Sequence, residues 1–419
     1  MEIQVDHLTR VEGHGNLHAE IVDGRVARVS FHVVEANRFF EGILRGHDAE
    51  EVAHIASRIC GICAVSHSCA SLQASEQALG LLISEQTLLL RRLIMHAEVI
   101  SSHALHVWFL AAPDYLRLPS VFPLIEKDPE TVRRAYRLKK MGYELGEAIL
   151  GRHTHPVSAL PGGFTAAPQV RAMEQMRDRL VEMRPDLEAM IELYRGVEVP
   201  QFEYPTEYVS LRQPDHYSFY GGKIVSNLRS SISAEKYREK LQEYVVLEST
   251  AKYVKWHRES YMVGALARVN NNHKQLHRTA KQAMRTLGIK PPCHNPFMNT
   301  HAQAVELVHC VEESIELIEM LLSRGIEDQW EPEYEARAGC GVGVVEAPRG
   351  LLVHDYSYDE HGRCTAANCI IPTNQNLANL NANLQAFLPQ IVDQPPAEIQ
   401  RQLEMLVRAY DPCISCSVH

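Results

Sequence analysis

The chain lacks three features that would assign it to a large class of proteins. No apolar run reaches the roughly 18 residues needed to cross a bilayer, and no apolar segment follows Met1 to predict a signal peptide. It has no basic excess either, because 42 Lys and Arg residues stand against 52 Asp and Glu residues. Phosphate binding requires concentrated positive charge. The sequence therefore predicts no direct membrane span and no nucleic-acid partner.

Cysteine content is moderate, with 10 residues in 419, and the size of the chain excludes a small disulfide-stapled scaffold. Four of the cysteines form two Cys-x-x-Cys pairs, Cys60 with Cys63 and Cys413 with Cys416. This spacing puts two sulfurs on one side of a turn, where a single metal can take both. A structural zinc knuckle, a thioredoxin-like redox pair and half of an iron–sulfur site all use it. A redox pair should lie at a βαβ helix start, and the surrounding pattern does not indicate one.

The distance between the two pairs argues against a structural staple. Zinc ribbons space their pairs by roughly 15–20 residues, whereas about 350 residues separate Cys63 from Cys413. Closing so long a loop is entropically costly. His419, three residues after Cys416, adds a further potential ligand. We therefore expect the chain to be the scaffold that brings its two ends together around a metal.

The hydrophobic periodicity predicts an α+β fold that is mainly helical. Residues 2–34 alternate as antiparallel strands around the turn Asp23-Gly24. Helical spacing covers residues 64–80, 85–110 (ending before Pro113), 129–150, 168–195, 234–259, 272–287, 301–323, 374–388 and 396–409. Short strands are expected within 197–233 and a second small β patch at 351–358 and 364–371. We expect one unit over 1–419, with a β-rich region (1–48), a helical core (49–335) and a C-terminal β patch with helices (336–419).

Further motifs occur in order along the chain. They are Arg10-Val11-Glu12-Gly13-His14, the segment Phe40–Gly46, the segment Arg58–His67, His155-Pro156 with Pro161-Gly162-Gly163, Glu346-Ala347-Pro348-Arg349-Gly350, and Asp411-Pro412-Cys413 with Cys416 and His419. With these motifs the chain resembles, from end to end, the large catalytic subunit of nickel–iron hydrogenases. The two cysteine motifs together are highly specific, and the others support them by their order.

The resemblance implies reversible, heterolytic cleavage of H2 to protons and electrons at a nickel–iron centre whose iron carries carbon monoxide and cyanide. Cys60 and Cys413 would be terminal ligands of nickel, and Cys63 and Cys416 would bridge nickel to iron. Soft thiolates suit both metals and bind them only when deprotonated. Electrons would pass to an iron–sulfur small subunit and then to further flavin or iron–sulfur electron-transfer subunits.

The resemblance also implies roles for acidic and basic side chains. Glu12 matches a proton-relay glutamate beside a terminal thiolate, since the proton from H2 needs a base and then a carrier. Without the family, a salt bridge from Glu12 to Arg10 would be the favoured interpretation. Arg349 would lie over the open metal position, where a guanidinium can polarise H2, and Asp114 and Asp411 would be its acidic partners.

Other positions match ligands and neighbours of the centre. Glu41 and His419, with a backbone carbonyl near Cys369, would hold magnesium or a related cation. A carboxylate is an ordinary magnesium ligand, whereas histidine is an unusual one. His67 would donate a hydrogen bond to a bridging sulfur.

Pro372 and Thr373 match positions that contact the cyanide of the iron. The short sequences around Ser66-His67 and Ser415-Cys416 are similar to those of cytoplasmic, bidirectional, multi-subunit members, so we expect a cytoplasmic protein. The sequence ends at the His after which the family is clipped, and a mature form is expected.

The remaining cysteines show no iron–sulfur spacing and are predicted to be small buried hydrophobes. They are Cys69, Cys293, Cys310, Cys340, Cys364 and Cys369. Two alternatives remain. The quinone-site large subunit of respiratory complex I shares the ancestry but lacks the cysteine pairs, and a structural zinc or iron–sulfur protein could use the pairs as a staple.

Overall fold

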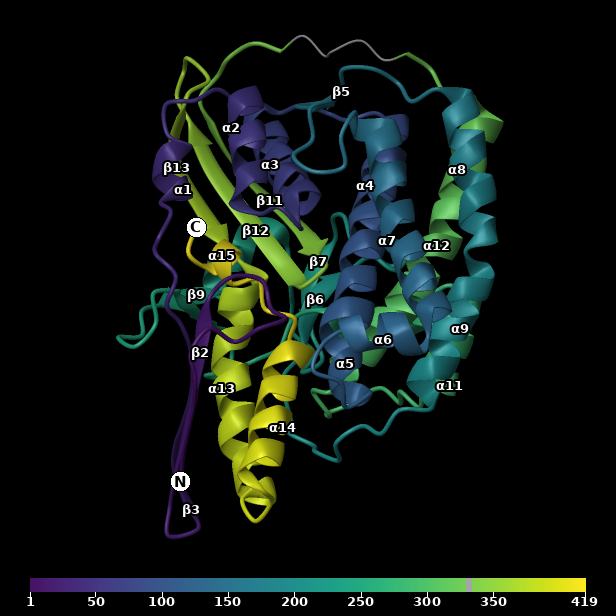
Figure 1. Ribbon diagram of the computed structural model, residues 1–419. Coiled ribbons are helices and arrows are strands. Elements are labelled where there is room, and N and C mark those ends of the chain that lie inside the picture. The colour runs from purple at the N-terminus through teal and green to yellow at the C-terminus, as the bar shows by residue number, and fades with distance from the viewer. Residues whose placement is uncertain (329–333) are drawn as a thin grey trace.

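Helices are the predominant elements of the protein, and small antiparallel sheets lie beside and between them (Figure 1). The structure is a computed structural model that describes residues 1–328 and 334–419. The predicted α+β class, mainly helical with an N-terminal β region and a second β patch, is confirmed. Within the described ranges, no helix is long and apolar enough to span a bilayer.

The N-terminal sheet consists of β1 (Glu2–Val5), β2 (Gly15–Val22) and β3 (Arg25–Val33), paired in the order β1-β2-β3. The predicted hairpin turn joins β2 to β3, and both Asp23 and Gly24 have positive φ, as a type I′ turn requires. Leu17 and Phe31 turn inward from this sheet and are completely buried. The N-terminal sheet runs along α13 (Pro372–Ile391) (Figure 1).

Long amphipathic helices build the body. Those that follow the predicted ranges are α3 (Ala64–Leu79), α4 (Glu85–Ala104), α7 (Pro129–Leu150), α12 (Met298–Arg324), α13 and α14 (Pro396–Ala409). Side chains cap the starts of α4 and α7. The Asp128 carboxylate, for example, accepts the Thr131 N–H at 3.1 Å, one position before Pro129 opens α7.

The remaining elements are short. They are α1 (Phe40–Ile43), α2 (Ala49–Ala56), α5 (Ala112–Tyr115), α6 (Phe122–Lys127), β4 (Ala159–Leu160), β5 (Gly163–Phe164), α8 (Val170–Glu182), α9 (Arg184–Arg195), β6 (Val209–Arg212), β7 (Lys223–Ser226), β8 (Ser231–Ile232), β9 (Gln242–Tyr244), β10 (Tyr253–Lys255), α10 (Ala265–Asn272), α11 (Arg278–Thr286) and α15 (Ile414–Ser417).

Three sequence predictions differ from the fold. The helix expected over 234–259 is wrong, because a 3-10 turn and the paired strands β9 and β10 occupy this segment. The stretch 168–195 is two helices, since Pro185 cannot continue α8 and instead opens α9. The helix predicted over 85–110 does not stop before Pro113, because α4 continues through a π-helical segment, Leu105–Ala111, into α5.

The C-terminal sheet, β11 (Gly339–Ala347), β12 (Gly350–Tyr358) and β13 (Cys364–Ile370), packs against α3 (Figure 1). Gly339, Gly341 and Gly343 alternate along the face of β11 that meets the helix. A Cβ on each would lie 2.1, 2.0 and 1.9 Å from carbonyl oxygens of α3. Only glycine allows this approach, so the backbone of β11 rests directly on α3.

Candidate metal centre

The two cysteine pairs meet in the fold. The four sulfurs of Cys60, Cys63, Cys413 and Cys416 all lie within 4.8 Å of one another, and all four residues are buried. Across the pairs, Cys60 Sγ lies 3.5 Å from Cys413 Sγ, and Cys63 Sγ lies 3.6 Å from Cys416 Sγ. The structure joins Cys413 to Cys416 as a disulfide. A metal can take these two sulfurs only after the disulfide is reduced.

The first pair lies between a short helical turn and the start of α3. The N–H groups of Ile62 and Cys63 both donate to Cys60 Sγ, at 3.2 and 3.1 Å. Burial would raise the pKa of the Cys60 thiol, but the hydrogen bond from Cys63 and the positive charge of Arg349 hold this pKa below its usual value. The turn is therefore preorganised for a thiolate at Cys60.

A buried carboxylate caps the helix that begins after Cys63. Glu98 of α4 accepts the N–H of Val65 at 2.6 Å and the N–H of Ser66 at 3.1 Å, and it also contacts the Ser66 hydroxyl. Cys63 itself makes no capping hydrogen bond. Burial raises the pKa of Glu98 to about 7. Glu98 thus fixes the end of α3 that presents Cys63, although no sequence motif points to it.

A single arginine ties the two pairs together. The Arg38 guanidinium donates to Ile59 O, just before Cys60, and to Ser415 O, just before Cys416. Its backbone N–H donates to Val418 O at 2.7 Å. Sequence reasoning missed Arg38 because neither partner is near it in the chain.

Glu12 lies against the second pair. One carboxylate oxygen is 3.2 Å from Cys413 Sγ and accepts the Ser415 N–H at 3.0 Å, and the other accepts the Ser415 hydroxyl. Glu12 also forms a parallel β-bridge with Cys413. Arg10 does not pair with Glu12, because its guanidinium donates to Leu110 O and to Asp114.

Arg349 lies in the turn between β11 and β12 and is buried. Its guanidinium donates to Asp411 O at 2.8 Å and to Asp411 Oδ1 at 2.9 Å. The predicted second partner, Asp114, pairs instead with Arg10 and with Arg408, at 2.5 and 2.9 Å. These two arginines come from opposite ends of the chain, so the local sequence around Asp114 could not indicate them.

His67 belongs to a buried chain of rings. Its Nδ1 lies 3.0 Å from His354 Nε2, and His354 Nδ1 lies 2.5 Å from the Tyr356 hydroxyl. Burial holds the pKa of His67 well below its usual value and lowers the pKa of His354 to about 3. Both rings are therefore neutral, and His67 Nε2 is the nitrogen left to face another partner.

Glu41, His419 and Cys369 also come together. Glu41 Oε1 accepts the Cys369 N–H at 3.0 Å and lies 3.3 Å from His419 Nε2. Although burial opposes it, the hydrogen bond from His419 helps to lower the pKa of Glu41 to about 2. The Lys252 ammonium lies 3.4 Å from both carboxylate oxygens, an ion pair that the sequence did not indicate.

Pro372 and Thr373 open α13 beside the second pair. Pro372 takes the first helical position, where its missing N–H costs no hydrogen bond. Thr373 is buried, and its hydroxyl accepts the Cys413 N–H at 3.0 Å. The Thr373 hydroxyl hydrogen therefore remains free to donate to another group.

The other cysteines differ in their environment. Cys69, Cys310, Cys364 and Cys369 are buried as predicted, whereas Cys293 is only partly buried. The prediction is wrong for Cys340, which is exposed. The glycines on either side of Cys340 face α3, so the period of two along β11 turns Cys340 away from the helix.

A second cluster of metal-ligand type consists of His96, His309 and Glu313. Here the hydrogen bonds assign the protons. His309 Nδ1 accepts the His277 N–H at 3.0 Å, so the ring proton is on Nε2, which faces Glu313 at 2.7 Å. His309 therefore presents a proton rather than a lone pair to this cluster.

Comparison with known proteins agrees with this geometry. The family model described as "Nickel-dependent hydrogenase" matches residues 38–138 and 204–419. Sulfhydrogenase 1 subunit alpha of Pyrococcus furiosus is 34% identical, over 100% of this chain and 98% of that protein. The NAD-reducing hydrogenase HoxS subunit beta of Cupriavidus necator is 27% identical, over 100% of this chain and 94% of that protein. A crystal structure of an NAD⁺-reducing [NiFe]-hydrogenase in the H2-reduced state superposes with a TM-score of 0.89, at 29% identity, over 100% of this chain and 99% of that chain.

Proposed function

The chain belongs to the nickel-dependent hydrogenase family, and we propose that its four clustered cysteines hold the nickel–iron centre. It is the large, catalytic subunit of a hydrogenase, an oxidoreductase that acts on H2. The convergence of the two Cys-x-x-Cys pairs carries the proposal for the site. Four buried sulfurs within 4.8 Å of one another fit soft metals.

When bound, the nickel–iron centre supplies heterolytic cleavage of H2 and accepts the electrons, and its iron carries carbon monoxide and cyanide. Cys60 and Cys413 would hold nickel alone, and Cys63 and Cys416 would hold both nickel and iron. The buried Thr373 hydroxyl, with Pro372 beside it, would donate a hydrogen bond to the cyanide. The hydrogen bond from the Cys413 N–H to Thr373 Oγ1 supports this role, since it leaves the hydroxyl hydrogen free.

Glu12 carries the proton away from the Cys413 sulfur. A proton leaving the sulfur has one short step to Glu12 Oε2, 3.2 Å away. The Ser415 N–H and hydroxyl donate to the same carboxylate and fix its orientation. This is the geometry that proton transfer by a positioned carboxylate requires.

Arg349 orients H2 over the metals, and Asp411 orients Arg349. Two hydrogen bonds to Asp411, through its backbone oxygen and its carboxylate, leave Arg349 Nη1 directed elsewhere, with Ser102 Oγ at 3.4 Å. Asp114 acts at a distance from Arg349, by holding Arg10 and Arg408 beside the site.

His67 donates its Nε2 proton to a bridging sulfur. With the Tyr356 hydroxyl donating to His354 Nδ1, the His354 Nε2 proton is directed at His67 Nδ1. The His67 ring then carries its own proton on Nε2. A donor to a metal-bound sulfur tunes that ligand.

Glu41, His419 and the Cys369 carbonyl bind magnesium or a similar cation. The 3.3 Å approach of His419 Nε2 to Glu41 supports the site. Lys252 competes with the cation for Glu41, because its ammonium already balances part of the charge of that carboxylate.

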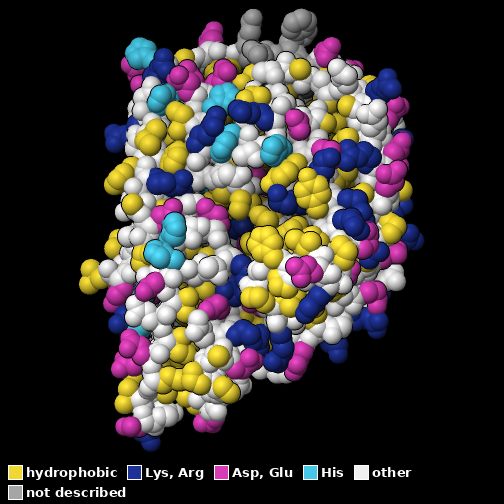
Figure 2. Space-filling model, viewed as in Figure 1, with side chains coloured by type: hydrophobic (Ala, Val, Ile, Leu, Met, Phe, Trp, Pro, Cys, Tyr) yellow, Lys and Arg dark blue, Asp and Glu magenta, His cyan; other side chains and the backbone are white. Residues whose placement is uncertain are grey.

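The electrons leave through an iron–sulfur small subunit and further flavin or iron–sulfur subunits in a cytoplasmic complex. Within residues 1–328 and 334–419, no second group of four cysteines lies close enough to hold a cluster. Hydrophobic side chains gather over α6 and α7 on one face (Figure 2). Phe122 of α6 and Tyr136 of α7 are 72% and 60% exposed. A contiguous exposed apolar patch is typical of a protein–protein contact.

Metal analysis of the purified complex tests the proposal. We expect nickel and iron at about one each per chain at this site, in the ratio that a bimetal centre requires. Zinc without nickel would instead identify a structural staple. Magnesium content and stability, both measured after exhaustive chelation, test the Glu41 site separately. A chain that contains no magnesium and keeps its full stability would show that Lys252 balances the charge of Glu41.

A further inference from the structure

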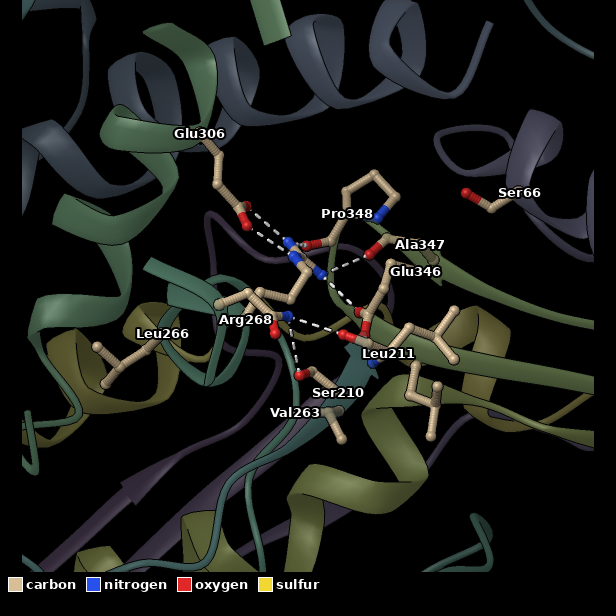
Figure 3. A network of polar contacts seen from close by, with 12 residues as sticks. Ser66, Ser210, Leu211, Val263, Leu266, Arg268, Glu306, Glu346, Ala347 and Pro348 are labelled. Atoms are coloured by element: carbon tan, nitrogen blue, oxygen red, sulfur yellow. Dashed lines mark hydrogen bonds and ion pairs between the residues drawn. The ribbon is translucent and has the colours of Figure 1, made fainter. Parts of the chain in front are cut away.

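We propose that Arg268 is a positioning residue that holds Arg349 in place. This inference rests on the role proposed above for Arg349. Arg268 is in α10 and is completely buried. It is absent from both cysteine motifs and from the contacts of the metal site. Figure 3 shows its guanidinium directed at the turn that carries Arg349.

Each of the five guanidinium hydrogens of Arg268 has a partner. Nε and Nη2 donate to the two oxygens of Glu306, both at 2.7 Å. Nη1 donates to Glu346 at 2.9 Å and to Ala347 O at 3.0 Å, and Nη2 also donates to Pro348 O at 2.9 Å. The two carbonyls belong to the residues directly before Arg349, so Arg268 holds the backbone of this turn.

The turn fits closely against the start of α10. A Cβ on Gly264 would lie 3.1 Å from Arg349 O, and a Cβ on Gly350 would lie 2.4 Å from Val263 Cγ2. Both glycines have positive φ. The segment that carries Arg268 and the turn that carries Arg349 are therefore in direct contact, which leaves the turn little room to move.

One helix holds both members of the Arg349–Asp411 pair. Glu306 of α12 binds Arg268, and Gln303, three residues earlier, donates to Asp411 Oδ2 at 2.9 Å. Asp411 Oδ1 accepts Arg349 Nη2. The turn of Arg349 and its carboxylate partner thus share α12 as their support.

Glu306 is itself fixed by two groups besides Arg268. His103 Nε2 lies 2.8 Å from one carboxylate oxygen, and the Tyr217 hydroxyl donates to the other at 2.6 Å. Lysine could not replace Arg268, because a lysine has three donors on one flexible atom while this site uses five donors in a planar fork.

Two roles for the buried ion pairs of Arg268 can be distinguished. They could contribute only to stability, or they could position Arg349, and each role predicts a different effect of mutating Arg268. Loss of stability lowers the amount of active enzyme regardless of the residue at 349. Loss of position lowers the rate only while Arg349 is there to be misplaced. The two are separated by a double-mutant cycle.

The test uses the assembled complex, with H2 oxidation followed by reduction of a viologen dye. Arg349→Lys alone should lower kcat, and full activity in this variant would overturn the role proposed for Arg349. Arg268→Lys should lower kcat by about 10- to 100-fold, because a displacement near 1 Å is enough for such a loss. The KM for H2 and the nickel content should stay unchanged, since the interaction is made in the transition state.

In the Arg349→Lys background, Arg268→Lys should cost less than about threefold. An equal cost in both backgrounds, with Arg349→Lys impaired, would overturn the positioning role alone. Amide hydrogen exchange over residues 344–352 gives a readout independent of turnover, and it should be faster in Arg268→Lys. Unchanged exchange there would also contradict the inference.

Arg184→Lys is the matched control. Arg184 forms the same two-point contact with Glu312 of α12, through Nε at 2.9 Å and Nη2 at 2.7 Å, but it lies away from the turn. It should leave kcat unchanged. If Arg268→Lys does not assemble, Tyr217→Phe removes one hydrogen bond to Glu306 and should show a smaller loss that again disappears in the Arg349→Lys background, whereas a loss that persists there would overturn the role.

Discussion

Glu12 and Cys413 pair as a parallel β-bridge although 401 residues separate them in the chain. The Ile414 N–H donates to Glu12 O at 2.9 Å, so backbone contacts bring the first strand region to the second cysteine pair. This backbone bridge places the carboxylate of Glu12 next to the Cys413 sulfur. Position and proton acceptance are thus supplied by different parts of the same residue.

Glu12→Gln separates the two. We expect exchange of H2 with D2O to fall by at least about 100-fold, because an amide cannot accept the proton. Nickel content should be unchanged, since the backbone bridge remains. Glu20→Gln, an exposed change in β2, is the control. Exchange at the full rate in Glu12→Gln would show that the proton leaves by another route.

Cys413→Ala should yield a chain without nickel, because a terminal ligand is missing from a site of four thiolates. Nickel measured by mass spectrometry of the purified chain decides the point. Cys340→Ala, which removes an exposed cysteine of β11, should keep both nickel and activity. Wild-type nickel in Cys413→Ala would reject the ligand assignment.

Gly341→Ala should destabilise the protein by about 1–3 kcal/mol, the usual cost of forcing an extra carbon into a packed interface. The new Cβ would lie 2.0 Å from Ala74 O, so helix and strand must separate. Thermal unfolding of the variant measures the loss. Gly42→Ala is the control, because no atom lies within 4 Å of a Cβ there. An unfolding midpoint equal to the wild type would mean that α3 can shift freely.

His301 should make stability depend on acid pH. Burial lowers its pKa to about 4 from 6.5, so between these values the unfolded chain binds a proton that the folded chain does not. Stability from this group is present above pH 6.5 and is lost as the pH falls to 4, by about 3 kcal/mol. Phenylalanine keeps the ring contacts with Tyr115 and Tyr194.

His301→Phe should therefore lose less stability than the wild type on acidification from pH 6.5 to 4, measured as thermal midpoints across this range. His361→Gln, at an exposed position, should keep the wild-type slope. If His301→Phe follows the wild-type curve, the ring is not kept neutral by burial.

Local pattern sufficed for the parts of the fold and site that are local. The Cys-x-x-Cys pairs, the turn Asp23-Gly24 and helices such as α14 follow from residue spacing alone. The segment 234–259 did not, because β9 and β10 are strands only through pairing with each other. Their sequence carries helical spacing as well, and tertiary contact decided between the two.

The partners of charged residues were harder to predict for the same reason. The ion-pair partners of Asp114 depend on distance in space, and it pairs with Arg10 and Arg408 rather than with Arg349. Lys252 reaches Glu41 from 211 residues away. Residue spacing along the chain does not indicate such ion pairs. The resemblance to a family identifies which positions have functional residues, but it does not say which of these residues pair with each other.

The direct contact of β11 with α3 has a mechanical consequence. Cys63 precedes α3, and Arg349 follows β11, so the separation between the metal ligand and the arginine is set by backbone against backbone. At the glycine positions the backbone of β11 lies against carbonyl oxygens of α3, and the Gln77 and Gln73 side chains accept the N–H groups of Val342 and Val344. Substitutions elsewhere in the hydrophobic core should therefore change the separation between Cys63 and Arg349 little, because the glycine positions of β11 fix the distance between strand and helix.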